Sequence, residues 1–146
     1  MRIEHDGMGE LMLPDETYYG IVAERHRVAF DVGPFTLDDY ETYVKAVALI
    51  KIACARANAE IGALDPEIAR LIEKAGWEVA EGQFKGNFNI NIFRGSGTPL
   101  NAAVNEVIAH RANELLTGEP KAASTPILTS TWRNLATMSS HQQKTS

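Results

Sequence analysis

The chain has 146 residues, which suits one domain of ordinary size. Its formal net charge is −5, which argues against nucleic acid or an anionic membrane as the main partner, because both need clustered Lys and Arg. A single cysteine, Cys54, excludes an intrachain disulfide. No secretory signal is visible, and no apolar run approaches the roughly 20 residues of a membrane span. These features predict a cytoplasmic protein.

The first part of the chain predicts an extended arm followed by a long helix. Leu11 and Leu13 alternate with polar or flexible neighbours and the pattern stops at Pro14, as in a short strand. Thr36 precedes two acids, which is typical of a helix N-terminus, and apolar residues then recur at three- and four-residue steps as far as Gly62. The expected inward stripe of this helix is Tyr40, Tyr43, Val47, Ile50, Cys54, Ala57 and Ile61.

Two further helices are expected. Asp65 and Pro66 predict the N-cap and first position of one helix, which ends at Gly82. Residues 88–92 alternate between apolar and Asn and predict a short strand or extended segment. The last helix follows a glycine turn and stops at Gly118. The fold class is therefore mainly α, with about three main helices and a short extended arm or hairpin.

The strongest candidate site is the turn that precedes the last helix. Gly95 and Gly97 allow a tight approach of the backbone to a ligand, and Ser96 and Thr98 add hydroxyl donors at the positive end of the helix. This pattern suits an anion, either a carboxylate or a phosphate, although no Gly-Lys-Ser or Gly-Lys-Thr of a P-loop is present. A plain glycine turn with a capped helix explains the same residues, and spacing alone leaves both interpretations open.

The sequence predicts no metal site and no cofactor. The four histidines, His5, His26, His110 and His141, do not have metal-ligand spacing, and surface or capping roles are expected for them. Cys54 lies on the predicted apolar stripe, which favours a buried, unreactive thiol.

Three stretches together resemble the aspartase/fumarase superfamily. The N-terminal stretch matches the pattern R-x-E-x-D-x-x-G, then proline, an aromatic-Gly pair, arginine and an aromatic residue. The matching positions are Arg2, Glu4, Asp6, Gly9, Pro14, Tyr19, Gly20, Arg25 and Phe30. Residues 50–65 resemble the family helix K-x-A-x-A-x-x-N, and residues 95–119 resemble the signature G-[AS]-G-T-x-x-N-M-N-x-N-E-V. The resemblance is continuous from Arg2 to Gly118.

The resemblance implies a fold and an activity. These enzymes are homotetrameric, mostly helical lyases without a cofactor that add or remove water or ammonia across fumarate, with active sites built from three subunits. It implies that Ser96, Thr98 and Asn101 bind a substrate carboxylate. It also implies that no catalytic residue falls within this chain. The expected region is the N-terminal domain of the family fold, without its central bundle of long helices.

Subfamily features point in two directions. The aromatic pair before Gly20 resembles aspartate ammonia-lyases, whereas Ser96 resembles fumarases. The sequence favours the hypothesis of an aspartate ammonia-lyase, and fumarate hydratase is the alternative. A third possibility is a non-enzymatic helical module that binds dicarboxylates or associates with a homologue. The chain departs from the signature at Pro99, Ala102 and Ala103, and the loss of an Asn removes a polar group near the expected site.

The pattern ends at Gly118, and residues 119–146 predict a separate, disordered tail rich in Ser and Thr. The family has a second signature at this place, H-P-N-x-x-V-N-x-x-Q-S-[ST]-N-D. A shift of one nucleotide before Thr125, with permitted codons, turns the tail into HPNIDVNMAQSSNDVIP. Trp132 and Met138 constrain this match, because each of their codons ends in G. We therefore expect an out-of-frame translation here, and a fragment that is inactive alone because it lacks the family's catalytic base loop.

Overall fold

The computed structural model describes residues 1–31, 33–92 and 97–118. The elements of the described part are the strands β1 (Arg2–Asp6) and β2 (Gly9–Leu13), the helices α1 (Ile21–Ala29), α2 (Glu41–Glu60), α3 (Pro66–Ala80) and α4 (Gly97–Thr117), and the short 3-10 helix η1 (Leu37–Asp39). The predicted mainly helical fold is confirmed, with one more helix than expected. The predicted tail of residues 119–146 lies outside the described residues.

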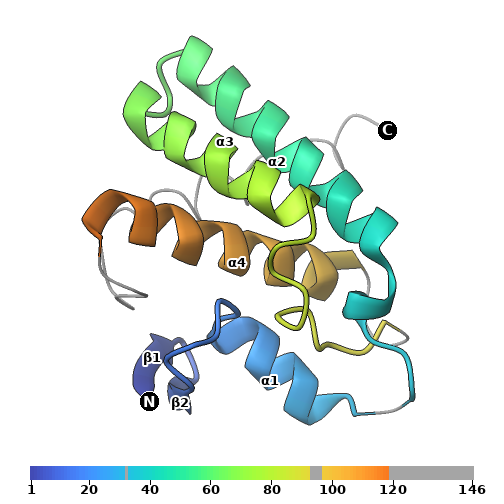
Figure 1. The fold of residues 1–146 in the computed structure, drawn as a ribbon. Coiled ribbons are helices and arrows are strands. Elements are labelled where there is room, and N and C mark those ends of the chain that lie inside the picture. The colour runs from blue at the N-terminus through green and yellow to red at the C-terminus, as the bar shows by residue number, and fades with distance from the viewer. Residues whose placement is uncertain (32, 93–96, 119–146) are drawn as a thin grey trace.

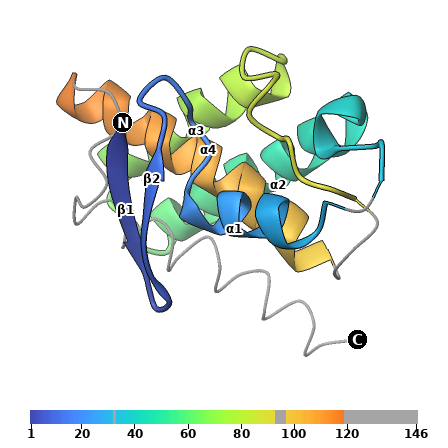
Figure 2. The same ribbon diagram turned by 90° about the horizontal axis from the view of Figure 1, so that it is seen from below.

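Helix α4 is the middle layer of the molecule (Figure 1). The pair α2 and α3 packs on one side of it, while α1 and the β1–β2 hairpin lie on the other side. Figure 2 shows the hairpin and α1 in front of α4 when the molecule is seen from below. Every residue from Ala102 to His110 is buried, so α4 is enclosed on all faces and not only along the apolar stripe that the sequence suggests.

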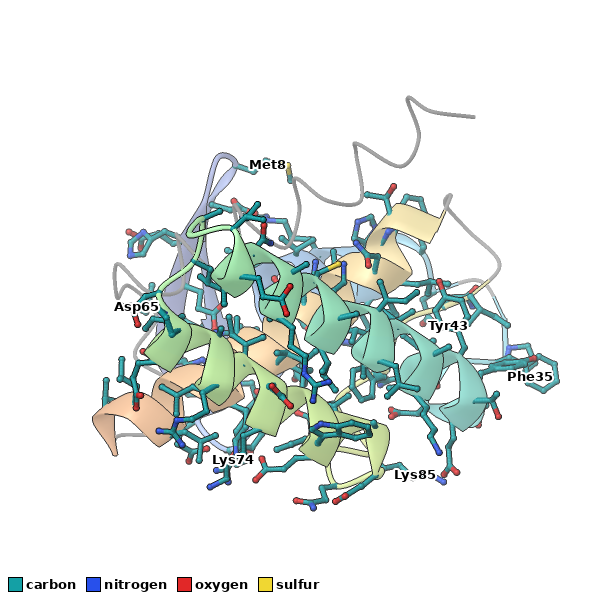
Figure 3. All side chains as sticks on the ribbon, turned by 90° about the horizontal axis from the view of Figure 1, so that it is seen from above. Met8, Phe35, Tyr43, Asp65, Lys74 and Lys85 are labelled. Carbon is teal, nitrogen blue, oxygen red and sulfur yellow. The ribbon has the colours of Figure 1, made fainter. Side chains whose placement is uncertain are left out.

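The expected extended arm is an antiparallel hairpin. Arg2 pairs with Leu13 and Asp6 pairs with Gly9, and the tip of the hairpin carries the exposed Met8 (Figure 3). Leu13 is fully buried and anchors β2 to the rest of the molecule. A two-stranded sheet is marginal alone, so this hairpin depends on the contacts described below.

The start of the long helix differs from the prediction. Thr36 leads into η1 rather than into α2, and its backbone N–H donates to Asp39 Oδ2 at 2.9 Å. Helix α2 begins five residues after Thr36, at Glu41.

The predicted inward stripe of α2 is wrong at most of its positions, and of its members on α2 only Val47 is buried. Ile50 is 52% exposed and Ile61 is 77% exposed, and Cys54 is partly exposed rather than buried. The residues of α2 that are buried are Val44, Val47, Ala48, Lys51, Ile52, Ala55 and Asn58. The helix carries two apolar stripes, and spacing alone does not tell which of them faces the core.

Helix α3 begins as the sequence predicts. The Asp65 carboxylate, at the start of α3 in Figure 3, accepts hydrogen bonds from the backbone N–H groups of Glu67 and Ile68 at 2.8 and 3.3 Å. Gly76 lies against Ile52 of α2, because a Cβ at this glycine would stand only 2.7 Å from Ile52 Cγ1. The close approach of α2 and α3 explains a glycine that helix propensity alone disfavours.

The alternating segment before α4 forms no strand: the Ile90 N–H donates to the Phe88 carbonyl at 2.9 Å, so the chain makes a tight turn where a strand or extended segment was predicted. Phe88 and Ile90 are buried, and the Ile90 carbonyl accepts the Leu37 N–H at 2.9 Å. Asn91 forms an isolated bridge with Thr36. This segment therefore ties the start of α2 to the chain that leads into α4.

Within the described residues, no helix is both long enough and apolar enough to cross a membrane.

Candidate functional site

The predicted site lies at the N-terminus of α4. Thr98 is exposed and Asn101 is half-buried, and the two positions share one side of the first turn because they are three residues apart. The first backbone N–H groups of a helix have no partner within it, and they carry the positive end of the helix dipole. Ser96, the third predicted residue, lies outside the described residues. The described part of this turn has the chemistry that suits an anion.

The neighbour of this turn is the beginning of α2. A Cβ on Gly97 would stand 3.9 Å from the Tyr43 hydroxyl, so a side chain at this position would be in ordinary contact with the tyrosine. Pro99 is buried and fixes the first turn of α4 in the core. Thr98 therefore projects from a turn that is held in place on its inner side.

A buried carboxylate on α4 caps the N-terminus of α1, although the two helices are far apart in the sequence. Glu106 accepts hydrogen bonds from the backbone N–H groups of Gly20, Val22 and Ala23 at 2.9, 2.8 and 3.0 Å. These N–H groups open α1, whose N-cap residue is a glycine without a side chain. A Cβ on Gly20 would lie 2.6 Å from Glu106 Cδ, so only glycine leaves room for this carboxylate.

A second buried cluster fastens the hairpin to α4. His110 Nδ1 lies 2.8 Å from the Tyr18 carbonyl oxygen, and its Nε2 lies 3.3 Å from Glu4 Oε1. Both neighbours offer acceptor oxygens to the ring nitrogens of His110. Glu4 also accepts from Arg2 Nε and from the Ile21 N–H, at 2.8 and 2.9 Å. Polar contacts of Glu4 thus hold β1, α1 and α4 together.

The two carboxyl groups have opposite pKa shifts. Burial raises the pKa of Glu106 to about 7, against the opposing hydrogen bonds from Ala23 and Val22. Burial also acts on Glu4, but the hydrogen bond and charge of His110, together with Arg2, outweigh it and hold the pKa of Glu4 below its ordinary value.

The surface role predicted for the histidines is wrong for His110, which is 4% exposed. His5 is exposed as predicted, His26 is half-buried and His141 lies outside the described residues. The cluster around His110 and Glu106 was missed, although one signal was available. Glu106 is the single charged residue in the otherwise apolar or neutral run from Ala102 to Ala109, and His110 follows it by one helical turn.

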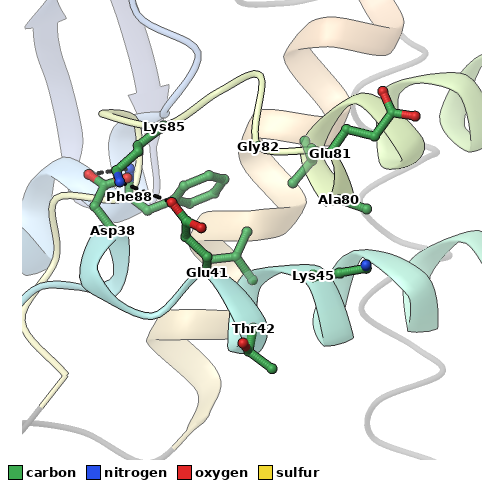
Figure 4. A pocket seen from close by; sticks show the side chains of 11 residues that line it. Asp38, Glu41, Thr42, Lys45, Ala80, Glu81, Gly82, Lys85 and Phe88 are labelled. Carbon is green, nitrogen blue, oxygen red and sulfur yellow. Dashed lines mark hydrogen bonds and ion pairs between the residues drawn. The ribbon is translucent and has the colours of Figure 1, made fainter.

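A hollow lies elsewhere on the surface, between the start of α2 and the end of α3 (Figure 4). Its volume is about 260 Å³. Three of its charged groups have partners: Lys85 Nζ donates to Glu41 at 2.9 Å, and the Asp38 carboxylate accepts from the N–H groups of Gly86 and Phe88 at 2.8 and 3.2 Å. Lys45 and Glu81 line the same hollow. The described residues contain no cluster of three or more His, Cys, Asp or Glu that could hold a metal ion.

In sequence and in fold, the chain matches the N-terminal region of the fumarate lyase (aspartase/fumarase) superfamily. No family model matches the chain. It is 42% identical over 127 residues to fumarate hydratase class II 1 of Pseudomonas aeruginosa. The aligned stretch covers 86% of this chain and 27% of that protein. It is also 44% identical over 119 residues to human mitochondrial fumarate hydratase. This aligned stretch covers 81% of this chain and 23% of that protein.

Two solved structures have the same fold. The fumarate lyase:delta crystallin structure from Brucella melitensis superposes with a TM-score of 0.79 at 34% identity, over 83% of this chain and 28% of that chain. The class II fumarase of Schistosoma mansoni gives a TM-score of 0.79 at 33% identity, over 84% of this chain and 26% of that chain. The chain thus spans about a quarter of the length of the proteins that it matches.

Proposed function

We propose that this chain is the N-terminal region of a fumarate hydratase and supplies contacts to a carboxylate of malate or fumarate. The observation that carries the proposal is the first turn of α4, where Thr98 and Asn101 lie at the positive end of the helix dipole. Ser96 would complete this set. The hydratase alternative is preferred over aspartate ammonia-lyase because the relatives named above are fumarate hydratases.

The role of these contacts is electrostatic. Anti elimination of water from malate removes a proton next to a carboxylate, and the negative charge that develops on that carboxylate needs donors already in position. Backbone N–H groups with the Thr98 hydroxyl meet this need. The base and the remaining walls of the site would come from the part of the protein that lies beyond this quarter and from partner subunits in a tetramer.

The departures from the family signature can be judged from the fold. Ala103 is fully buried in α4, so this position packs in the core of the described chain and does not face the solvent side of the first turn. Ala102 is buried as well. The replacements at both positions therefore leave the exposed donor Thr98 in place.

We also propose that the chain is translated out of frame from a point between Glu119 and Ser124 onward, and that the gene encodes the second family signature in another frame. The support is the sequence itself, since a single shift before Thr125 yields that signature in one register. The nucleotide sequence tests this directly. A gene in which no single-nucleotide shift restores the signature and a long open frame would rule it out.

The enzymatic proposal is tested with the product of the restored frame. We expect this product to form fumarate from malate, measured by ultraviolet absorbance, and not from aspartate. We expect the 146-residue chain alone to show no turnover with either substrate. Fumarate formation from aspartate would instead favour the ammonia-lyase.

One observation favours a second candidate function, association with a full-length homologue. The outer stripe of α2 exposes Tyr43, Ile50 and Ile61, which are 39%, 52% and 77% accessible. A module of this kind would co-purify with a full-length fumarate hydratase in cells that make both. Failure to co-purify would leave the hydratase fragment as the better account.

A further inference from the structure

A buried oxygen without a hydrogen-bond partner lies on α4, one helical turn beyond Asn101. It is Oδ1 of Asn105, which has no partner in the part of the chain that the structure describes, and this residue is only 2% exposed. Buried polar atoms normally have a partner, because an unpaired oxygen loses its hydration and gains nothing in exchange. An exception of this kind is expected where the unpaired atom serves a binding site.

The position of Asn105 on the helix relates it to the candidate site. Asn105 follows Thr98 by seven residues and Asn101 by four, so the three side chains share one face of α4. Exposure decreases along this face, from the exposed Thr98 through the half-buried Asn101 to the buried Asn105. Because helical side chains lean toward the N-terminus of their helix, the Asn105 side chain leans toward Asn101 and the first turn.

Asn101 is the polar neighbour that α4 offers to this oxygen. Positions three and four residues away on a helix lie closest to a given side chain. For Asn105 these positions are Asn101, Ala102, Ile108 and Ala109. Only Asn101 among them has a polar side chain, and side-chain amides four residues apart are close enough for a hydrogen bond.

We propose that Asn105 is a positioning residue for the carboxylate site: its Oδ1 accepts one N–H of Asn101 while the other N–H of Asn101 binds the ligand carboxylate. The proposal rests on the function proposed above and deepens it, because it identifies the group that orients one carboxylate contact. An asparagine amide has two N–H donors at one end and an oxygen at the other, and only the donor end attracts a carboxylate. The bond to Asn105 turns that donor end toward the ligand and gives the buried oxygen its partner.

The first experiment measures the melting temperature of the 146-residue chain and of its Asn105→Ala variant. Because Asn105 Oδ1 has no partner in the free chain, its loss breaks no hydrogen bond there. We expect Asn105→Ala to melt within about 4 °C of the parent. A much lower melting temperature would overturn the proposal, since the amide would then already hold the fold together.

The second experiment is a double-mutant cycle on an active enzyme. It uses a chimaera in which residues 1–118 replace the matching region of Pseudomonas aeruginosa fumarate hydratase class II 1. We expect Asn101→Ala and Asn105→Ala each to lower kcat/KM for malate about tenfold. Because Asn105 acts through Asn101, Asn105→Ala should change kcat/KM by less than about twofold in an Asn101→Ala background. A purely structural role would instead give the same loss in both backgrounds and would overturn the proposal.

Two further variants complete this test. Asn113→Ala is the matched control, because Asn113 is a buried asparagine of the same helix about 22 Å from Thr98, and it should leave kcat/KM within about twofold. Thr98→Val separates the proposal from the function on which it rests. If Thr98→Val lowers kcat/KM and Asn105→Ala does not, the positioning role is wrong and the carboxylate site stands. If neither variant changes kcat/KM, or if the folded chimaera is inactive, both are contradicted.

Discussion

The pairing of Gly20 with Glu106 allows a sharp test of the structure. Substitution of Gly20 by Ala adds a methyl group that would stand 2.6 Å from Glu106 Cδ and 2.7 Å from Oε1. The backbone at Gly20 has φ −114° and ψ −170°, which any residue adopts, so the substitution has no backbone penalty. The cost arises only from the collision with the carboxylate and from the hydrogen bonds that its displacement breaks.

The expected magnitude follows from these two effects. Overpacking of this kind costs about 1–3 kcal/mol, and each weakened N–H bond at the start of α1 costs about 0.5–1.5 kcal/mol. Alanine recovers about 0.4–1 kcal/mol through the unfolded chain. We expect Gly20→Ala to lower the free energy of unfolding by about 2–4 kcal/mol, measured by urea denaturation and circular dichroism. Gly7→Ala is the matched control, because a Cβ there meets nothing within 4 Å, and it should change the same free energy by less than about 0.5 kcal/mol.

A double-mutant cycle shows whether the collision is the cause. In a Glu106→Ala background the partner of the collision is gone, so Gly20→Ala should then cost less than about 1 kcal/mol. The reasoning is refuted if Gly20→Ala has the same cost in both backgrounds, or if it is neutral in the parent chain.

Three further predictions concern the helices and the buried acid. Asp65→Ala should lower the free energy of unfolding by about 1 kcal/mol through loss of the α3 N-cap, while the exposed Glu60→Ala should change it by less than about 0.5 kcal/mol. Gly76→Ala should destabilise in urea despite better helix propensity, because its Cβ meets Ile52, and an added Ile52→Val should recover part of the loss. The pKa of Glu106 is raised to about 7 in the fold, so its stabilising contribution is complete below pH 4.5 and is lost as the pH rises to about 7. The parent chain should therefore lose stability relative to Glu106→Gln over this range in denaturation curves, and a constant difference would contradict the shift.

Caps and chain breaks were the features that the sequence predicted best. Asp65 caps α3 as expected, because an N-cap depends on residues two and three positions away. The approximate extent of α2, α3 and α4 follows from similar local signals. By contrast, α1 was missed because it is short and polar, and the group that caps it is Glu106, which is 86 positions from Gly20 in the chain. No local pattern contains that contact.

The choice of buried face also lay beyond local pattern. The two apolar stripes of α2 have the same spacing, and only packing against α3 selects the one with Ile52 and Ala55. For the candidate site, the turn at Thr98 was found because glycine, hydroxyl and helix-start signals coincide in sequence. Its neighbour Tyr43 and the supporting Glu106 cluster depend on how distant segments meet, so they required the structure.

The central claim is that the first turn of α4 supplies carboxylate contacts for a fumarate hydratase. The most direct measurement uses a chimaera in which residues 1–118 replace the matching region of Pseudomonas aeruginosa fumarate hydratase class II 1. We predict that it interconverts malate and fumarate, and that Thr98→Val lowers kcat/KM by about 10²-fold or more. The control Thr42→Val, at an exposed threonine of α2, should leave kcat/KM unchanged. A folded chimaera whose activity is indifferent to Thr98→Val would contradict the account.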